Sequence, residues 1–110
     1  MDQLVAYSRA IMGGVGAERI VSQEEQREGW CEADCEVTLR QCDYRFDNGV
    51  VVRRTIEVDD YPSALACSEC WITYEVLELG SSSGIEPLRK NFDNVCREAY
   101  WLRYHDDVVL

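Results

Sequence analysis

The sequence predicts an α+β fold: an antiparallel meander of three to four strands, with a short N-terminal helix and a longer C-terminal helix packed on one face. Three observations predict it. Apolar residues recur at helical spacing near both ends of the chain, apolar and polar residues alternate along its middle, and Asp47-Asn48-Gly49 is a turn signal within that region. The chain has 110 residues, of which 46% are hydrophobic, so we expect a single domain over 1–110 with a packed core.

Each expected helix rests on an apolar stripe. Near the N-terminus the stripe stops at the glycine-rich segment 13–16, which places a short helix at 2–12. Near the C-terminus the apolar residues step by four and three, and Pro87 sits in the first turn, where its missing N–H costs nothing. The longer helix is therefore expected over 86–104. Its stripe consists of Leu88, Phe92, Val95, Ala99 and Leu102.

Three strands are expected between the helices. Apolar and polar residues alternate over 31–39, which predicts a half-buried strand with one acidic face, and a phase slip at Gln41 suggests a β-bulge. Asn48-Gly49 tolerates the positive φ angles of a type I′ turn, so a hairpin should return the chain along 50–58. Residues 71–79 are rich in β-forming side chains and predict the third strand.

The charge of the chain is strongly negative. Twenty-one acids against eleven bases give a formal net charge of −10. Such a chain is repelled by bare nucleic acid and by anionic membranes, so we expect neither as a direct partner, and a basic protein is the natural complement. Residues 18–36 hold seven acids against two arginines, a net charge of −5, which is half of the total.

The acids of 18–36 form the candidate partner-binding site. On a strand over 31–39 three of them would share one face at steps of about 6.6 Å, and such a row can occupy a basic groove built for nucleic acid. A merely soluble acidic surface is the alternative. Trp30 is included because an aromatic side chain beside charged residues is a typical interface anchor. The candidate residues are Glu24, Glu25, Glu28, Trp30, Glu32, Asp34 and Glu36.

These observations lead to one functional hypothesis. The chain would be a non-enzymatic acidic binding or inhibitor protein that occludes a basic, nucleic-acid-binding surface of a partner protein or nucleoprotein complex. Phage-encoded anti-CRISPR proteins and DNA mimics are similar in size and charge, and no sequence motif extends that likeness. A homodimer formed by pairing edge strands of the meander is left open.

The six cysteines permit a rival hypothesis. The chain shows neither signal-peptide features nor a run of ~20 apolar residues, so we expect a reducing cytoplasm and free, mostly buried thiols without a metal or other cofactor. On a strand, Cys31 and Cys35 would lie about 13 Å apart, too far for one zinc ion. The alternatives are disulfides and a small zinc-stabilised adaptor that uses Cys67 and Cys70.

Catalysis is not expected. The one histidine, His105, is followed by two aspartates, and acidic neighbours raise rather than lower the pKa of a nucleophilic thiol. Paired acids such as Asp59-Asp60 are adjacent in sequence and point in divergent directions, whereas acid–base catalysis needs convergent carboxyl groups.

Overall fold

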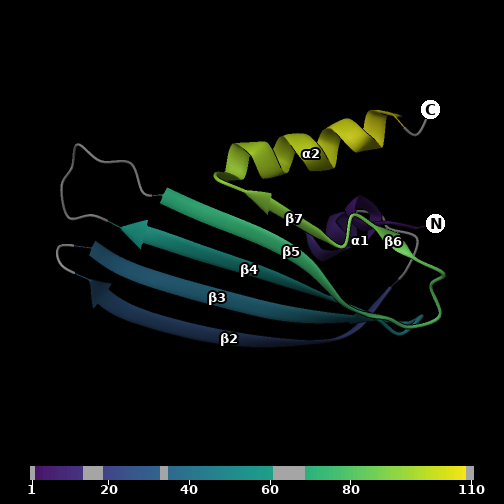
Figure 1. Cartoon of the computed structure of the whole chain (residues 1–110), viewed down its shortest axis with the longest axis horizontal. Helices are drawn as coiled ribbons and strands as arrows, with labels where there is room; N and C mark the ends of the chain where they lie inside the picture. Colours follow the sequence, from purple (N-terminus) through teal and green to yellow (C-terminus); the bar gives the residue numbers. More distant parts are fainter. Residues whose placement is uncertain (1, 14–18, 33–34, 61–68, 109–110) are drawn as a thin grey trace.

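The computed structural model describes residues 2–13, 19–32, 35–60 and 69–108 (Figure 1). Within these residues the chain is an α+β protein with a short N-terminal helix, an antiparallel sheet and a C-terminal helix, which confirms the expected fold class. The elements in chain order are β1 (Asp2–Gln3), α1 (Leu4–Ile11), β2 (Ile20–Glu32), β3 (Cys35–Phe46), β4 (Val50–Asp60), β5 (Glu69–Leu79), β6 (Ile85–Glu86), β7 (Arg89–Phe92) and α2 (Val95–Val108).

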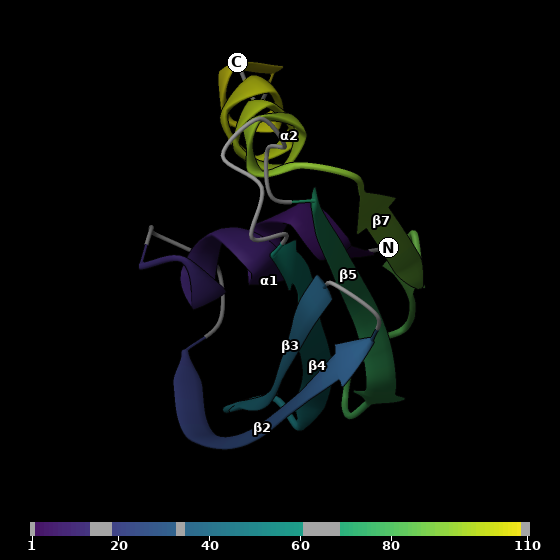
Figure 2. The ribbon, with the colours of Figure 1, turned by 90° about the vertical axis from the view of Figure 1, so that its left-hand side faces the viewer.

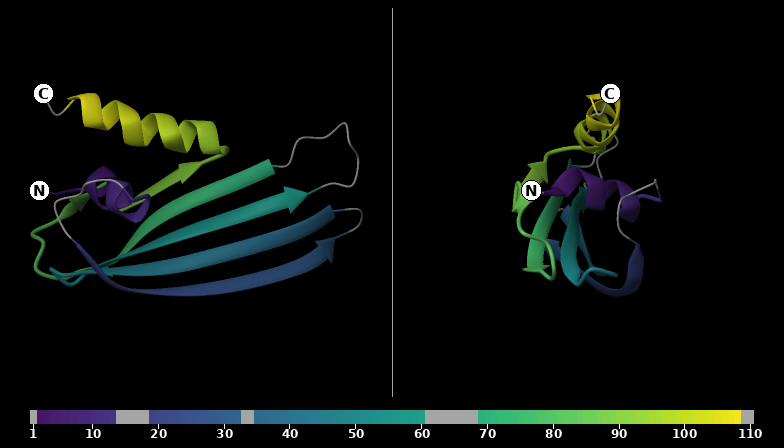
Figure 3. Two further views of the ribbon diagram at one scale, coloured as in Figure 1. Left: turned by 180° about the vertical axis from the view of Figure 1, so that it is seen from behind. Right: turned by 90° about the vertical axis from the view of Figure 1, so that its right-hand side faces the viewer.

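The main sheet has the order β2-β3-β4-β5-β7, and every neighbouring pair is antiparallel. The part of the chain that the structure describes therefore has five strands in this sheet, one more than the upper expectation. A separate parallel pair, β1 with β6, joins the start of the chain to the segment before β7. The molecule is elongated, 46 × 29 × 20 Å, because the long strands extend past the helices (Figures 1 and 3).

Both helices lie on one side of the sheet, and the sheet curls toward them (Figure 2). We call this side the helix face and the other side the open face. The buried cluster joins α1 to the helix face of β3, β4 and β5, and the rings of Tyr7 and Phe46 meet edge to face with centroids 4.9 Å apart. Its members are Leu4, Tyr7, Phe46, Val50, Val52, Ile72, Tyr74, Ile85 and Phe92.

The sheet consequently has two different ends. At the covered end, which contains the turn 47–49, Phe46, Val50 and Val52 are at most 1% exposed. The open end consists of 26–31 of β2, 36–41 of β3 and 55–59 of β4, and neither helix lies over its first two strands (Figures 1 and 3). Every side chain from 21 to 31 is exposed on β2, which forms one edge of the sheet.

The predicted hairpin between β3 and β4 is confirmed, but its turn type differs. The Gly49 N–H donates to the Phe46 carbonyl at 2.9 Å, so Asp47 and Asn48 are the central residues and Gly49 follows them with φ +88°. This is a three-residue connection rather than the expected two-residue type I′ turn. The turn also contacts the loop after β5, where a Cβ on Gly80 would lie 2.3 Å from the Gly49 carbonyl carbon.

The expected strand over 31–39 is wrong. Residues up to 32 belong to β2 and residues from 35 belong to β3, and the two strands pair with each other. The alternation that suggested a single strand spans the connection between them. No bulge interrupts the pairing at Gln41; the register shifts instead at Ile20/Ser22 and at Val51/Val52.

The first half of the expected C-terminal helix is also wrong. Residues 85–86 and 89–92 form β6 and β7, and Phe92 pairs with Ile72 of β5. The helix begins at Val95 because the Asn94 side chain accepts the Arg97 N–H at 2.8 Å and caps the first turn. The N-terminal helix agrees with expectation within two residues at its start. Among the described residues, neither helix has the length and apolar character required to cross a bilayer.

Candidate interaction surface

The register arranges the side chains of the open face in rows that run across the sheet. Directly opposed residues of antiparallel strands lie on the same face, and same-face neighbours on one strand are about 6.6 Å apart. Two rows at the open end combine indoles, apolar side chains and acids from segments far apart in the sequence. They are Trp30–Val37–Asp59 and Glu28–Leu39–Glu57–Trp71.

The acids of these rows make up the candidate site together with Glu24, which lies on the same face of β2 but nearer the covered end, opposite Asp43. We call the acidic patch Glu24, Glu28, Glu57 and Asp59 together with Trp30. Glu24 and Glu28 lie four residues apart on β2, about 13 Å, and Glu28 and Glu57 flank Leu39 at about 10 Å, twice the strand spacing. None of these carboxylates forms an ion pair within the described part of the chain, so their charge is free to meet a partner.

The open face toward the covered end is different because two of its acids, Asp43 and Glu78, are paired with arginines. Arg53 Nε lies 2.8 Å from Asp43 Oδ1, and Arg45 Nη1 lies 3.3 Å from Glu78 Oε2. The Asp43 carboxylate raises the pKa of the Arg53 guanidinium through this hydrogen bond. Among the described acids on the open face of β2 to β5, Glu75 is the one without an ion pair that lies outside the acidic patch.

Of the predicted site residues, the structure brings together Glu24, Glu28 and Trp30, and it separates Glu25 from them. Glu25 lies opposite Cys42, a position on the helix face. Its Oε1 accepts hydrogen bonds from Arg40 at 2.6 and 2.8 Å and lies 3.3 Å from Arg27 Nε. The Arg40 hydrogen bond holds the pKa of the Glu25 carboxyl below its usual value. Glu25 is thus occupied within the chain.

The predicted row of Glu32, Asp34 and Glu36 does not lie along one strand. Position 32 belongs to β2 and pairs with Cys35, whereas Glu36 belongs to β3 and pairs with Cys31. Glu36 is exposed and lies on the helix face, away from the acidic patch. Asp34 and the side chain of Glu32 lie outside the described residues.

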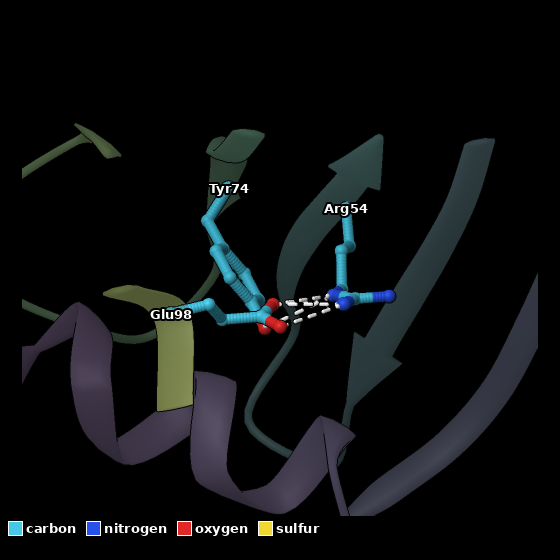
Figure 4. A network of polar contacts seen from close by, with 3 residues as sticks. All are labelled: Arg54, Tyr74 and Glu98. Atoms are coloured by element: carbon cyan, nitrogen blue, oxygen red, sulfur yellow. Dashed lines mark hydrogen bonds and ion pairs between the residues drawn. The ribbon is translucent and has the colours of Figure 1, made fainter. Parts of the chain in front are cut away.

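A buried polar network fastens α2 to the sheet (Figure 4). Arg54 and Glu98 form an ion pair at 2.8 Å, with side chains only 14% and 4% exposed, and the Tyr74 hydroxyl donates to Glu98 at 2.6 Å. Burial and the hydrogen bond to Glu98 raise the pKa of Tyr74. In sequence, Arg54 occupies an apolar position of an alternating strand, and its buried partner explains that exception.

The cysteines show no metal site among the described residues. The expectation of mostly buried thiols is wrong for the four described cysteines: Cys31 and Cys96 are exposed, and Cys42 and Cys70 are half-buried. All four are free thiols. No cluster of three or more His, Cys, Asp or Glu side chains is placed to hold a metal ion in the described ranges. Burial raises the pKa of Cys70, which disfavours the thiolate that zinc needs. Cys67 lies outside the described residues, so the zinc alternative stays a prediction.

Two acids of the patch, Glu57 and Asp59, were missed by the sequence reasoning, although a signal for them existed. The hairpin at 47–49 places Phe46 and Val50 on either side of a three-residue connection. Counting outward from these residues puts Glu57 opposite Leu39.

In comparisons with protein-family models, curated proteins and solved structures, nothing matches this chain.

Proposed function

We propose that this chain is a non-enzymatic binding protein whose acidic patch occludes a basic, nucleic-acid-binding surface of a partner protein. The observation that carries the proposal is the concentration of carboxylates without ion-pair partners among the described residues at the open end, beside the exposed Trp30. Surfaces that bind nucleic acid carry several lysines or arginines to neutralise phosphates, and an array of carboxylates satisfies the same cations.

Two further features support this reading. Trp30 is 38% exposed, and a tryptophan beside carboxylates supplies both apolar contact and a face for a partner's arginine. The patch also extends across the neighbouring strands β2, β3 and β4, which suits contact with the surface of a partner protein. The size and charge of the chain fit phage-encoded inhibitors of host defence, such as anti-CRISPR proteins or DNA mimics, acting in a host cytoplasm.

The proposal is tested with an arginine-rich peptide as the basic probe and two charge-matched variants. Glu24→Gln/Glu28→Gln removes two charges from the acidic patch. Glu36→Gln/Glu86→Gln removes two charges from exposed positions elsewhere and changes the net charge from −10 to −8 in the same way. Fluorescence anisotropy should show an affinity about tenfold lower for the first variant and nearly unchanged for the second.

Occlusion is tested in a second arm of the same experiment. The native chain should displace a fluorescent DNA duplex from the peptide, and rising salt should weaken that competition steeply because the contacts are ionic. Equal loss of affinity in the two charge-matched variants would mean that net charge alone governs binding, and the proposed surface would be wrong.

A further inference from the structure

We infer that a groove between α2 and the β5–β7 edge binds a small planar aromatic molecule that carries an anionic group. The groove has a volume of about 830 Å³, a size typical of small-molecule sites. This ligand is opposite in charge to the basic partner proposed for the acidic patch, so the inference goes beyond that function and stands independently of it. The residues used below are Trp71, Lys90, Phe92, Arg97, Tyr100 and Trp101.

The aromatic part of the groove is suited to a flat ring. The rings of Phe92 and Trp101 pack with their centroids 5.2 Å apart, and the ring of Tyr74 packs against that of Trp101 with centroids 5.8 Å apart. Tyr100 lines the same groove and remains 59% exposed. Trp71, which ends the open-face row at the sheet edge beyond the last residue of β5 that pairs with β7, also lines it and is 47% exposed. Two large aromatic side chains left in solvent around a hollow indicate a surface that a ring can cover by stacking.

The charge in the groove is positive at one point. Lys90, the one lysine of the sequence, is half-buried, and its Nζ lies 5.7 Å from the centroid of the Phe92 ring. It forms no ion pair with any described residue, whereas the second cation of the groove, Arg97, lies 3.2 Å from Asp93. The carboxylate that lines the groove, Asp93, is the one paired with Arg97, so the ammonium group beside the aromatic rings is left as a site for an anion.

The groove is held in shape by the buried network. Glu98 stands three residues before Trp101 on α2 and bonds to both Arg54 and Tyr74 of the sheet. Tyr74 contacts the aromatic groove floor as well, so the same side chain fixes the helix and the ring cluster. A preformed groove spares the ligand the cost of ordering its walls.

Titration of the ¹⁵N-labelled full chain tests the inference with three probes: indole-3-acetate, adenosine monophosphate and uncharged indole. The three tryptophans give separate indole N–H signals. Those of Trp71 and Trp101 should shift with the anionic probes, and that of Trp30 should not. Indole should bind about ten times more weakly than the better of the two anions, because it lacks the partner for Lys90.

Paired variants separate the role of Lys90 from a general charge effect. Lys90→Gln should lower the affinity for the preferred anion about tenfold and leave indole unaffected. Arg89→Gln removes the same charge from the neighbouring position on the other face of β7 and should change neither. Preference for indole-3-acetate would assign an aromatic carboxylate as the ligand class, and preference for adenosine monophosphate would assign a nucleotide.

Three results would overturn the inference: equal affinity for indole and both anions, an unchanged affinity in Lys90→Gln, or no shift at Trp71 and Trp101 at millimolar probe. Protection of a thiol gives a second readout. The exposed Cys96 lines the groove and should be alkylated more slowly with ligand present, while the exposed Cys31 on β2 should react at the same rate. None of these results depends on whether the acidic patch binds a basic partner.

Discussion

The covered end and the open end of the sheet are built from the same strands but differ in what surrounds them. At the covered end the strands contact α1 and α2, and Val50 and Val52 are completely buried. At the open end β2 exposes the side chains of both its faces from 21 to 31. The covered end therefore holds the main buried cluster, whereas at the open end a single buried apolar side chain, Val37 of β3, lies opposite Trp30 among the described residues.

The largest expected effect is a loss of stability, and it compares the replacement by alanine of one aromatic side chain at each end of the sheet. Phe46 is 1% exposed and contacts Tyr7, so Phe46→Ala should lower the free energy of unfolding by about 4 kcal/mol. Trp30→Ala, at the open end, should cost no more than about 1 kcal/mol although the residue is larger. Urea unfolding followed by circular dichroism measures both. Similar costs for the two variants would show that the open end also carries core packing.

The next test compares a buried and a half-exposed ion pair. Glu98→Ala should cost about 3 kcal/mol because it leaves Arg54 buried without its partner, whereas Asp43→Ala should cost at most about 1 kcal/mol. Thermal or urea unfolding of the two variants gives the comparison. Replacing both buried partners, Arg54→Met with Glu98→Leu, should recover much of the loss, since the apolar pair fills the space. A double variant as unstable as Glu98→Ala would contradict this account of the network.

The smallest effect appears at high pH. Burial and the bond to Glu98 raise the pKa of Tyr74 above its ordinary value of 10.0, and burial and Cys42 raise the pKa of Tyr44 to about 12. Above pH 10 the unfolded chain loses these protons first, so the stability present at lower pH should decline as pH rises. For Tyr74 the slope is up to about 1.4 kcal/mol per pH unit. Tyr74→Phe should flatten the decline between pH 10 and 12, which urea unfolding at a series of pH values measures.

The sequence predicted those elements in which burial of one side produces a regular spacing of apolar residues, or in which a turn signal is present. The α+β class, α1, the hairpin at 47–49 and the strand beginning near 71 were predictable because each has a buried side or a turn signal. The strand β2 was not, since both of its faces are exposed and no apolar period marks it. Phe92 misled the helix assignment because it fits the spacing of the apolar stripe while serving as a strand residue.

The candidate site was only partly predictable for the same reason. The excess of acids in 18–36 falls largely on the edge strand β2, and Glu24, Glu28 and Trp30 do share a face. Which acids join them depends on strand register, a long-range property that composition does not contain. Glu25 could not be assigned to its arginine partner without that register, and Glu57 entered the patch only through the pairing of β4 with β3.

The most direct test of the central claim is to map where a basic ligand binds. An arginine-rich peptide is titrated into the ¹⁵N-labelled chain, and the shifts of the backbone amides and of the three indole N–H groups are followed. Shifts are expected at Glu24, Glu28, Glu57 and the Trp30 indole, while the helix-face residue Glu36 and the α2 amides should stay unchanged. Shifts confined to α2 or the helix face, with Trp30 unmoved, would contradict the claim that the open end is the binding surface.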